Sequence, residues 1–329
     1  MNTVNQLPKI SILCPCYNHA PYIRQALDSI LMQEVDFPIE ILVGEDCSPD
    51  NSRAVLQAYE AEHPGVFQML YREKNMGGTS NFYDLITRAS GTYIITLETD
   101  DYWTDPHKLQ KQADFLDAHP EYIGCAHICE KVDGLGVSQG LLPTGSPQVG
   151  QRYTLTDFLR AKPAFQTATL LYRNVFQDGG DYSIIRTAHP LVGDFTVYSI
   201  LLQRGDIYVM PDCMSVYRQV IKKGSNSFSA QETAHREKIL LLGMQMLVNL
   251  EIYFKKKVDY SIRKQDLLNS YLAAWLRRRP GYTTDGLRFL WEHVGGKAHL
   301  RAGLFVLGFP FRKLLAHASP RKKEAHHVQ

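Results

Sequence analysis

The chain has 329 residues, 44% of them hydrophobic and 21% charged, values typical of a folded protein with a buried core rather than of a disordered one. This length allows one large domain with an extension, or two domains. A formal net charge of only +2 excludes a strongly basic protein, so no nucleic-acid partner is expected. Residues 1–8 are polar and lack the apolar core of a signal peptide, which predicts a cytoplasmic protein.

The first hundred residues alternate between short apolar runs and segments with helical spacing of apolar residues. The predicted strands cover residues 10–14, 39–43, 66–71 and 93–97, and the predicted helices cover 22–33, 52–63 and 79–90. This alternation predicts an α/β fold in which helices cover a parallel sheet. Ligands of such sheets bind at the carboxyl ends of the strands.

The second part of the chain has a different pattern. Its predicted elements are a helix over 108–119, strand-like pieces within 124–153, a strand over 165–172, a helix over 195–203, a strand over 207–210, and helices over 239–254 and 267–276. We therefore expect an α/β domain over 1–222, divided into 1–103 and 104–222, and a mainly helical C-terminal region over 223–329.

Acidic side chains follow the fourth predicted strand. Asp100 and Asp101 are adjacent, and Glu98 precedes them by two residues. Adjacent carboxylates repel each other unless a cation neutralises them, and Mg²⁺ or Mn²⁺ binds one or two carboxylates together with phosphate oxygens. Asp100 and Asp101 are therefore candidate metal ligands, with a solvated acidic turn as the alternative. Glu98 either completes the site or only caps the turn.

Several further segments give this acidic pair a context. They are Cys14-Pro15-Cys16-Tyr17-Asn18, Glu45-Asp46-Cys47-Ser48-Pro49-Asp50, Lys74-Asn75-Met76-Gly77-Gly78, the run 89–94, and Trp103, Pro106, Lys108 and Leu109. In this order they resemble the inverting glycosyltransferase family 2, closely from residue 9 to residue 120 and more loosely to residue 220.

The resemblance implies a glycosyltransferase-A fold with a nucleotide-binding half (1–103), an acceptor half (104–222) and a helical C-terminal extension. It further implies metal-dependent transfer of a hexosyl or hexosaminyl group, with inversion, from a nucleotide-sugar, most simply a UDP-sugar. Mn²⁺ or Mg²⁺ is the implied cofactor. A glycan or a lipid-linked glycan is the implied acceptor, in bacterial surface polysaccharide biosynthesis.

The same resemblance assigns roles to single residues. Pro15, Tyr17 and Asp46 match positions that hold the nucleotide base, with Asp46 accepting from the uracil N–H. Asp100 matches the residue near the ribose, and Asp101 matches the metal ligand. Two glutamates stand where this family more often has aspartate, one before Asp46 and one before the acidic pair, so the full ligand set stays open.

Three more candidates depend on this comparison. Asp194, at the start of an apolar helical segment, is the candidate general base that takes the proton of the acceptor hydroxyl, and a helix N-cap is the alternative. Lys74 maps near the base or the phosphates, or is a solvated surface cation. Arg218 precedes the cationic loop 222–229, which either closes over the diphosphate or is an ordinary solvated loop.

Two other classes of protein share the strand–helix alternation. A dinucleotide-dependent dehydrogenase needs a Gly-x-Gly-x-x-Gly turn after its first strand, and this chain has none there. A non-catalytic nucleotide-sugar-binding or scaffold protein with the same fold is the remaining alternative.

The C-terminal residues suggest contact with a membrane surface. The run 300–313 is apolar with basic flanks and is followed by three cations at 321–323, a composition that suits the interface of an anionic bilayer. Its apolar core is far shorter than the roughly 20 residues of a spanning helix. We therefore expect peripheral contact with the inner face of the cell membrane, with an ordinary packing helix or a subunit interface as the alternative.

Overall fold

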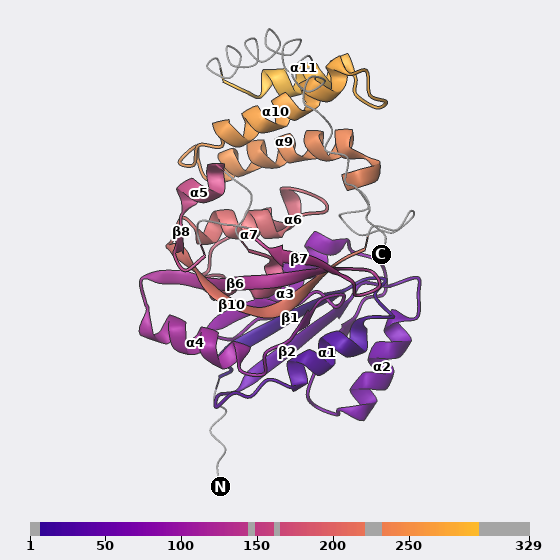
Figure 1. The fold of residues 1–329 in the computed structure, drawn as a ribbon, viewed down its shortest axis with the longest axis vertical. Coiled ribbons are helices and arrows are strands. Elements are labelled where there is room, and N and C mark those ends of the chain that lie inside the picture. The colour runs from indigo at the N-terminus through magenta and orange to yellow at the C-terminus, as the bar shows by residue number, and fades with distance from the viewer. Residues whose placement is uncertain (1–6, 144–148, 161–164, 221–231, 296–329) are drawn as a thin grey trace, which may run out of the picture.

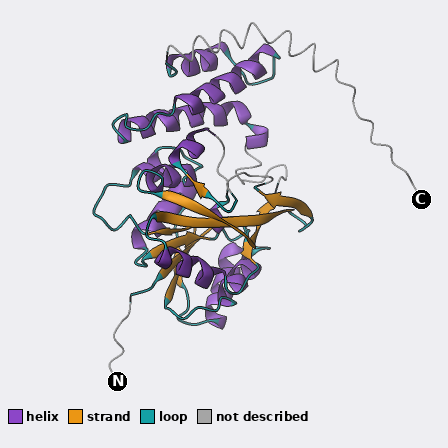
Figure 2. Cartoon of the chain, turned by 60° about the vertical axis from the view of Figure 1, so that its left-hand side comes forward, coloured by secondary structure: helices purple, strands orange, loops and turns teal. Residues whose placement is uncertain are grey.

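The structure is a computed structural model that describes residues 7–143, 149–160, 165–220 and 232–295. A large mixed sheet has helices on both faces, and a further layer of helices lies beyond one of these faces (Figure 1). Figure 2 shows the same layers from a second direction.

The strands are β1 (Ile10–Cys16), β2 (Ile39–Glu45), β3 (Gln68–Tyr71), β4 (Tyr93–Thr96), β5 (Tyr102–Trp103), β6 (Tyr122–Asp133), β7 (Ser138–Leu142), β8 (Arg152–Tyr153), β9 (Leu171–Arg173) and β10 (Asp206–Gln219). The helices are α1 (Ile23–Leu31), α2 (Ser52–Glu62), α3 (Gly78–Arg88), α4 (Lys108–Ala118), α5 (Leu155–Arg160), the 3₁₀ helix η1 (Thr167–Thr169), α6 (Ile184–Thr187), α7 (Asp194–Leu201), α9 (Arg236–Tyr253), α10 (Ser261–Leu276) and α11 (Thr284–Glu292).

The main path of the sheet has the strand order β3-β2-β1-β4-β9-β6-β10-β5. Strands β1 to β4 run parallel to one another, as the sequence predicts. Strands β9 and β5 are antiparallel insertions that make the sheet mixed. The chain moves from β1 outward to β3 and then returns to place β4 on the other side of β1. In open α/β sheets, ligands bind at the carboxyl ends of the strands beside such a reversal.

The central strands are buried on both faces, which explains their uninterrupted apolar runs. On β1, Ile12 packs into the core beneath α1, α2 and α4, and Leu13 packs into the core on the opposite face, with α3 and α7. Each face therefore has its own hydrophobic core, and together the two cores hold the strand ends that carry the polar loops.

The prediction of a strand over residues 165–172 is wrong for most of its length. The chain forms η1 there, and only the short strand β9 follows. The backbone carbonyls of Ala168 and Thr169 accept hydrogen bonds from the side chains of Trp103 (3.1 Å) and Gln112 (2.9 Å). Because these side chains replace a neighbouring strand as partners, the backbone is not held in an extended conformation.

The strand predicted over residues 207–210 is much longer in the structure, where β10 continues to Gln219. Pro211 hides the continuation in the sequence because proline has no N–H and is seldom found within a strand. The pairing with β6 shifts register between Met210 and Cys213 and again before Ser215. Such irregularities accommodate the proline without ending the strand.

The C-terminal helices have a core of their own and are also fastened to the sheet domain. Leu240, Leu268 and Leu290 join α9, α10 and α11. Leu247 and Leu250 of α9 pack in a second cluster that reaches α6 and α7. The helical character predicted for this region is thus confirmed between 232 and 295, whereas the domain boundary at 222/223 stays a prediction.

None of the helices that the structure describes is both long and apolar enough to cross a membrane. The apolar run 300–313 and the loop 222–229 lie outside the described residues, so their predicted contacts with a membrane and with the diphosphate stay predictions.

Gly91, which precedes β4, offers a test of this packing. A Cβ atom there would lie 2.7 Å from the Ser11 backbone nitrogen and 2.9 Å from the Ile10 carbonyl carbon, whereas one at Gly78 would meet nothing within 4 Å. We expect Gly91→Ala to lower the free energy of unfolding by about 1–3 kcal/mol, as overpacking does, in urea denaturation. Gly78→Ala, the control, should change the free energy of unfolding little. Equal stability of both variants would contradict the close packing at Gly91.

Candidate active site

Three carboxylates meet in the turn that follows β4. Ligand atoms of Glu98, Asp100 and Asp101 lie within 4.8 Å of one another. The Asp101 N–H donates to the Glu98 carbonyl at 2.9 Å, and this hydrogen bond closes the turn. The backbone N–H of Thr99 donates to the Pro15 carbonyl at 3.4 Å and ties the turn to the end of β1. The adjacent pair predicted from the sequence therefore has a third carboxylate beside it.

The environment of this acidic cluster disfavours three negative charges. Asp101 is only 3% exposed, and burial, followed by repulsion from Asp100 and Glu98, raises its pKa well above its ordinary value. Glu98 is open to solvent on one side, yet the protein packed around it and the charges of Asp100 and Asp194 raise its pKa to about 8. A divalent cation would offset this repulsion and favour the ionised forms.

Arg218, at the end of β10, fixes the acidic turn. Its backbone N–H donates to Asp101 Oδ1 at 2.7 Å, and its Nε donates to the Asp100 carbonyl at 3.0 Å. The guanidinium also donates to Gln25 Oε1 at 2.8 Å and lies over the Tyr22 ring, 4.5 Å from its centroid. Arg218 is 7% exposed. The contacts described here are those of a residue that positions the turn, and the role predicted for Arg218 at the diphosphate stays a prediction.

His19 is a member of the site that the sequence analysis missed. One ring nitrogen, Nδ1, lies 2.9 Å from Thr99 Oγ1, and the other, Nε2, lies 3.6 Å from Asp100 Oδ2. Asn18, with a φ of 63°, turns the chain after β1 so that His19 faces the acidic turn. Its place directly after the first strand, at the edge where ligands bind, is the signal that could have identified it.

The second oxygen of Asp100 is chemically informative. Asp100 Oδ1 is buried and has no hydrogen-bond partner among the described residues. Leaving a buried carboxylate oxygen without a partner is costly, and an oxygen-preferring cation is the partner that a pair of carboxylates suits. The donor set thus fits Mg²⁺ or Mn²⁺.

Asp46, directly after β2, holds the neighbouring loop. Its carboxylate oxygens accept from the backbone N–H groups of Met76 (2.7 Å) and Gly77 (3.0 Å), and its carbonyl accepts from the Asn75 side chain (3.2 Å). Asp46 is 1% exposed, and burial is the main cause of its raised pKa. Lys74 lies exposed in this same loop. The contact predicted between Asp46 and the uracil is not tested by these hydrogen bonds and stays a prediction, as does the role of Lys74.

Pro15 and Tyr17 lie where the sequence places them, at the end of β1. Pro15 is paired with Gly44 of β2 and is partly exposed, and Tyr17 follows the strand and is half-buried. Both are thus at the carboxyl edge of the sheet, close in sequence to His19. Their predicted contact with the nucleotide base also stays a prediction.

Asp194 comes from the second half of the chain, and its charge is one of the causes that raise the pKa of Glu98, after burial and Asp100. It is the first residue of α7. The N-cap of this helix is Gly193 and not Asp194, which was the alternative role for Asp194. Its Oδ1 accepts from the Phe195 N–H at 2.7 Å. Burial raises the pKa of Asp194, and a hydrogen bond from the Thr167 side chain opposes this shift.

His189 positions the loop that leads to Asp194. Its Nδ1 accepts from the backbone N–H groups of Leu191 (3.0 Å) and Val192 (3.1 Å), so this nitrogen carries no proton. Burial lowers the pKa of His189 to about 4. The ring is therefore neutral near pH 7 and acts as a fixed acceptor. No sequence pattern indicates this role, because the ring binds the backbone and not a ligand.

Known proteins resemble this chain in sequence and in fold. The model of the family described as "Glycosyl transferase family 2" matches residues 11–180. The uncharacterized protein Rv1520 of Mycobacterium tuberculosis is 31% identical over 274 residues, which are 83% of this chain and 75% of that protein. The poly(ribitol-phosphate) β-N-acetylglucosaminyltransferase TarS of Staphylococcus aureus is 29% identical over 145 residues, 43% of this chain and 24% of TarS.

The fold is similar to that of TarS as well. The crystal structure of residues 1–349 of S. aureus TarS in complex with UDP-GlcNAc superposes with a TM-score of 0.58 at 17% identity, over 88% of this chain and 82% of that one. The family and the fold expected from the sequence are thereby confirmed. The chain belongs to glycosyl transferase family 2 and has the glycosyltransferase-A fold.

Proposed function

We propose that this chain transfers a sugar, with inversion, from a UDP-sugar to a glycan or lipid-linked acceptor in the biosynthesis of bacterial surface polysaccharide. The observation that carries the proposal is the cluster of Glu98, Asp100 and Asp101 after the carboxyl end of β4, together with the effect of the Asp194 charge on Glu98. One relative, TarS of S. aureus, supports both the donor and the pathway: its structure was solved in complex with UDP-GlcNAc, and its name gives an activity on poly(ribitol-phosphate).

In this proposal Asp101 and Asp100 hold Mn²⁺ or Mg²⁺. Such an ion, when bound, neutralises the charge that develops on the departing diphosphate. Arg218 holds the Asp101 carboxylate through its backbone N–H and the Asp100 backbone through its Nε. Pro15, Tyr17 and Asp46 line the same edge on the side of β1 and β2, where the nucleotide base would lie.

Asp194 is the proposed general base. It takes the proton from the acceptor hydroxyl while that oxygen bonds to the anomeric carbon and the bond to the UDP oxygen breaks. Attack from the face opposite the diphosphate inverts the anomeric centre. The position of Asp194 supports this role, because it enters from α7 and thus from a different element than the metal-binding turn. The loop held by His189 leads to Asp194 and limits where the Asp194 carboxylate can lie.

The metal site can be tested by removing one charge and keeping the hydrogen bond. Asp101→Asn retains an oxygen that accepts from Arg218, and we expect it to weaken UDP binding in Mn²⁺ by more than about tenfold in calorimetry. Because the raised pKa shows that ionised Asp101 destabilises the metal-free fold, the variant should be at least as stable as the wild type in EDTA.

Asp114→Ala, which removes an exposed carboxylate of α4, is the matched control and should bind UDP normally. Tight UDP binding that neither EDTA nor Asp101→Asn changes would show that no metal bridges protein and diphosphate.

The base can be tested with Asp194→Asn. We expect turnover to fall by roughly 10²–10⁴-fold, the usual contribution of a positioned base, while UDP binding is retained. UDP release in the presence of candidate acceptors is the measurement. Asp181→Asn, at an exposed aspartate of the same half, is the control and should be fully active. Near-normal turnover of Asp194→Asn would assign the proton transfer to another group, and UDP binding without turnover by the wild type would favour the scaffold alternative.

A further inference from the structure

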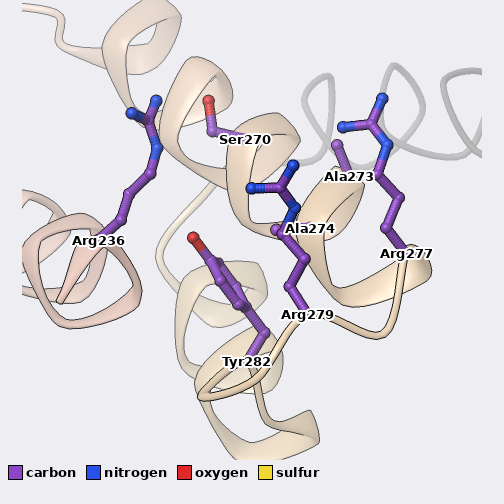
Figure 3. A pocket seen from close by; sticks show the side chains of 7 residues that line it. All are labelled: Arg236, Ser270, Ala273, Ala274, Arg277, Arg279 and Tyr282. Carbon is purple, nitrogen blue, oxygen red and sulfur yellow. The ribbon is translucent and has the colours of Figure 1, made fainter. Parts of the chain in front are cut away.

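The C-terminal helices contain a pocket that is separate from the acidic site. Its volume is about 380 Å³. It is lined by Arg236, Ser270, Ala273, Ala274, Arg277, Arg279 and Tyr282 (Figure 3). This volume lies within the range of pockets that hold small ligands. The lining contains three arginines and no carboxylate.

The arginines reach the pocket from two different helix ends. Arg236 is the first residue of α9, whereas Arg277 and Arg279 follow α10. Arg278 lies between the last two in a left-handed conformation, with a φ of 52°, and its N–H donates to the Trp275 carbonyl at 2.8 Å. This tight turn places Arg277 and Arg279 in the lining and leaves Arg278 outside it.

Helix dipoles do not account for this gathering of charge. A cation is favourable at the C-terminal end of a helix, which suits Arg277, but it is unfavourable at an N-terminal end, where Arg236 lies. The ion pair that the described residues give Arg236 is a long one, 4.0 Å to Glu232. Arg279 has no carboxylate within 4.0 Å in the part of the chain that the structure describes. Glu237 lies near Gly281 and Tyr282, outside the lining.

The donors in the pocket are those that bind phosphate. In Figure 3 the hydroxyls of Ser270 and Tyr282 lie between the guanidinium groups of Arg236 and Arg279. One guanidinium group can donate two parallel N–H hydrogen bonds to the oxygens of a phosphate, and hydroxyls add further donors. We propose that this arginine pocket binds a phosphate-bearing group of a small molecule or of a chain, as an anion site distinct from the acidic donor site. The proposal does not depend on the transferase reaction.

Calorimetry with inorganic pyrophosphate, on the full chain in EDTA, tests the pocket without metal or donor. We expect binding to the wild type, and a loss of affinity of roughly tenfold or more when Arg236→Gln and Arg279→Gln are combined, because two charge-assisted contacts are lost. Arg278→Gln removes the same charge from the neighbouring position and should leave affinity unchanged. Asp101→Asn should also leave it unchanged, which excludes the acidic site as the place of binding.

Absence of pyrophosphate binding by the wild type would overturn the proposal. So would equal weakening by Arg278→Gln, because it would indicate diffuse charge and not a site. Arg279→Lys keeps the charge but loses the paired donors, so reduced affinity in this variant supports the site even if the double variant does not fold, as thermal unfolding would reveal.

Co-sedimentation with phosphatidylglycerol vesicles distinguishes the source of the phosphate, with phosphatidylcholine vesicles as the control. Vesicle binding that is lost in the double variant identifies a lipid headgroup. Vesicle binding that is unchanged, together with lost pyrophosphate binding, identifies a soluble phosphate-bearing ligand. Both results support the arginine pocket.

Discussion

The repulsion among the carboxylates of Glu98, Asp100 and Asp101 is the interaction on which the arrangement of the rest of the site depends. Three acidic groups within 4.8 Å of one another are held together by the fold, although burial raises the pKa of Asp101 and Glu98. Ionisation of this turn is therefore unfavourable in the protein alone, and a bound cation would favour the ionised form. Arg218 and the hydrogen bond that closes the turn hold the Asp101 carboxylate and the backbone of the turn in place.

The order of the strands explains how distant parts of the chain reach this turn. Strands β9, β6 and β10 continue the sheet beyond β4, so the end of β10 comes back to β5 and to the acidic turn. Helix α7 packs on the sheet face that contains Leu13, in the same core as Phe82 of α3, and its first residue is Asp194. Residues 1–103 and 104–222 thus contribute strands to one sheet, and the acidic turn lies where these two parts of the chain meet.

Much of this could be predicted from local sequence. The apolar runs of β1, β2 and β4 are largely buried on both faces, so their pattern is unambiguous. The adjacency of Asp100 and Asp101 needs no tertiary information. The contact of Arg218 with Asp101 spans 117 positions, and no local pattern predicts it. Pro211 concealed the length of β10 for a similar reason, since the compensating bulge depends on β6. The arginine pocket needs Arg236 from another helix, which the visible run of arginines after α10 does not indicate.

The irregular pairing of β10 with β6 has a consequence for changes of chain length. Side chains of a strand alternate between its two faces, so the register after the bulge decides which way each residue points. The two shifts between Met210 and Ser215 therefore set the orientation of Arg218 three residues later. Deleting one residue from this stretch would leave the strand paired but would turn the guanidinium to the opposite face of the sheet. The irregular pairing thus sets the side-chain alternation of the end of β10, and we expect insertions and deletions there to be more damaging than in surface loops.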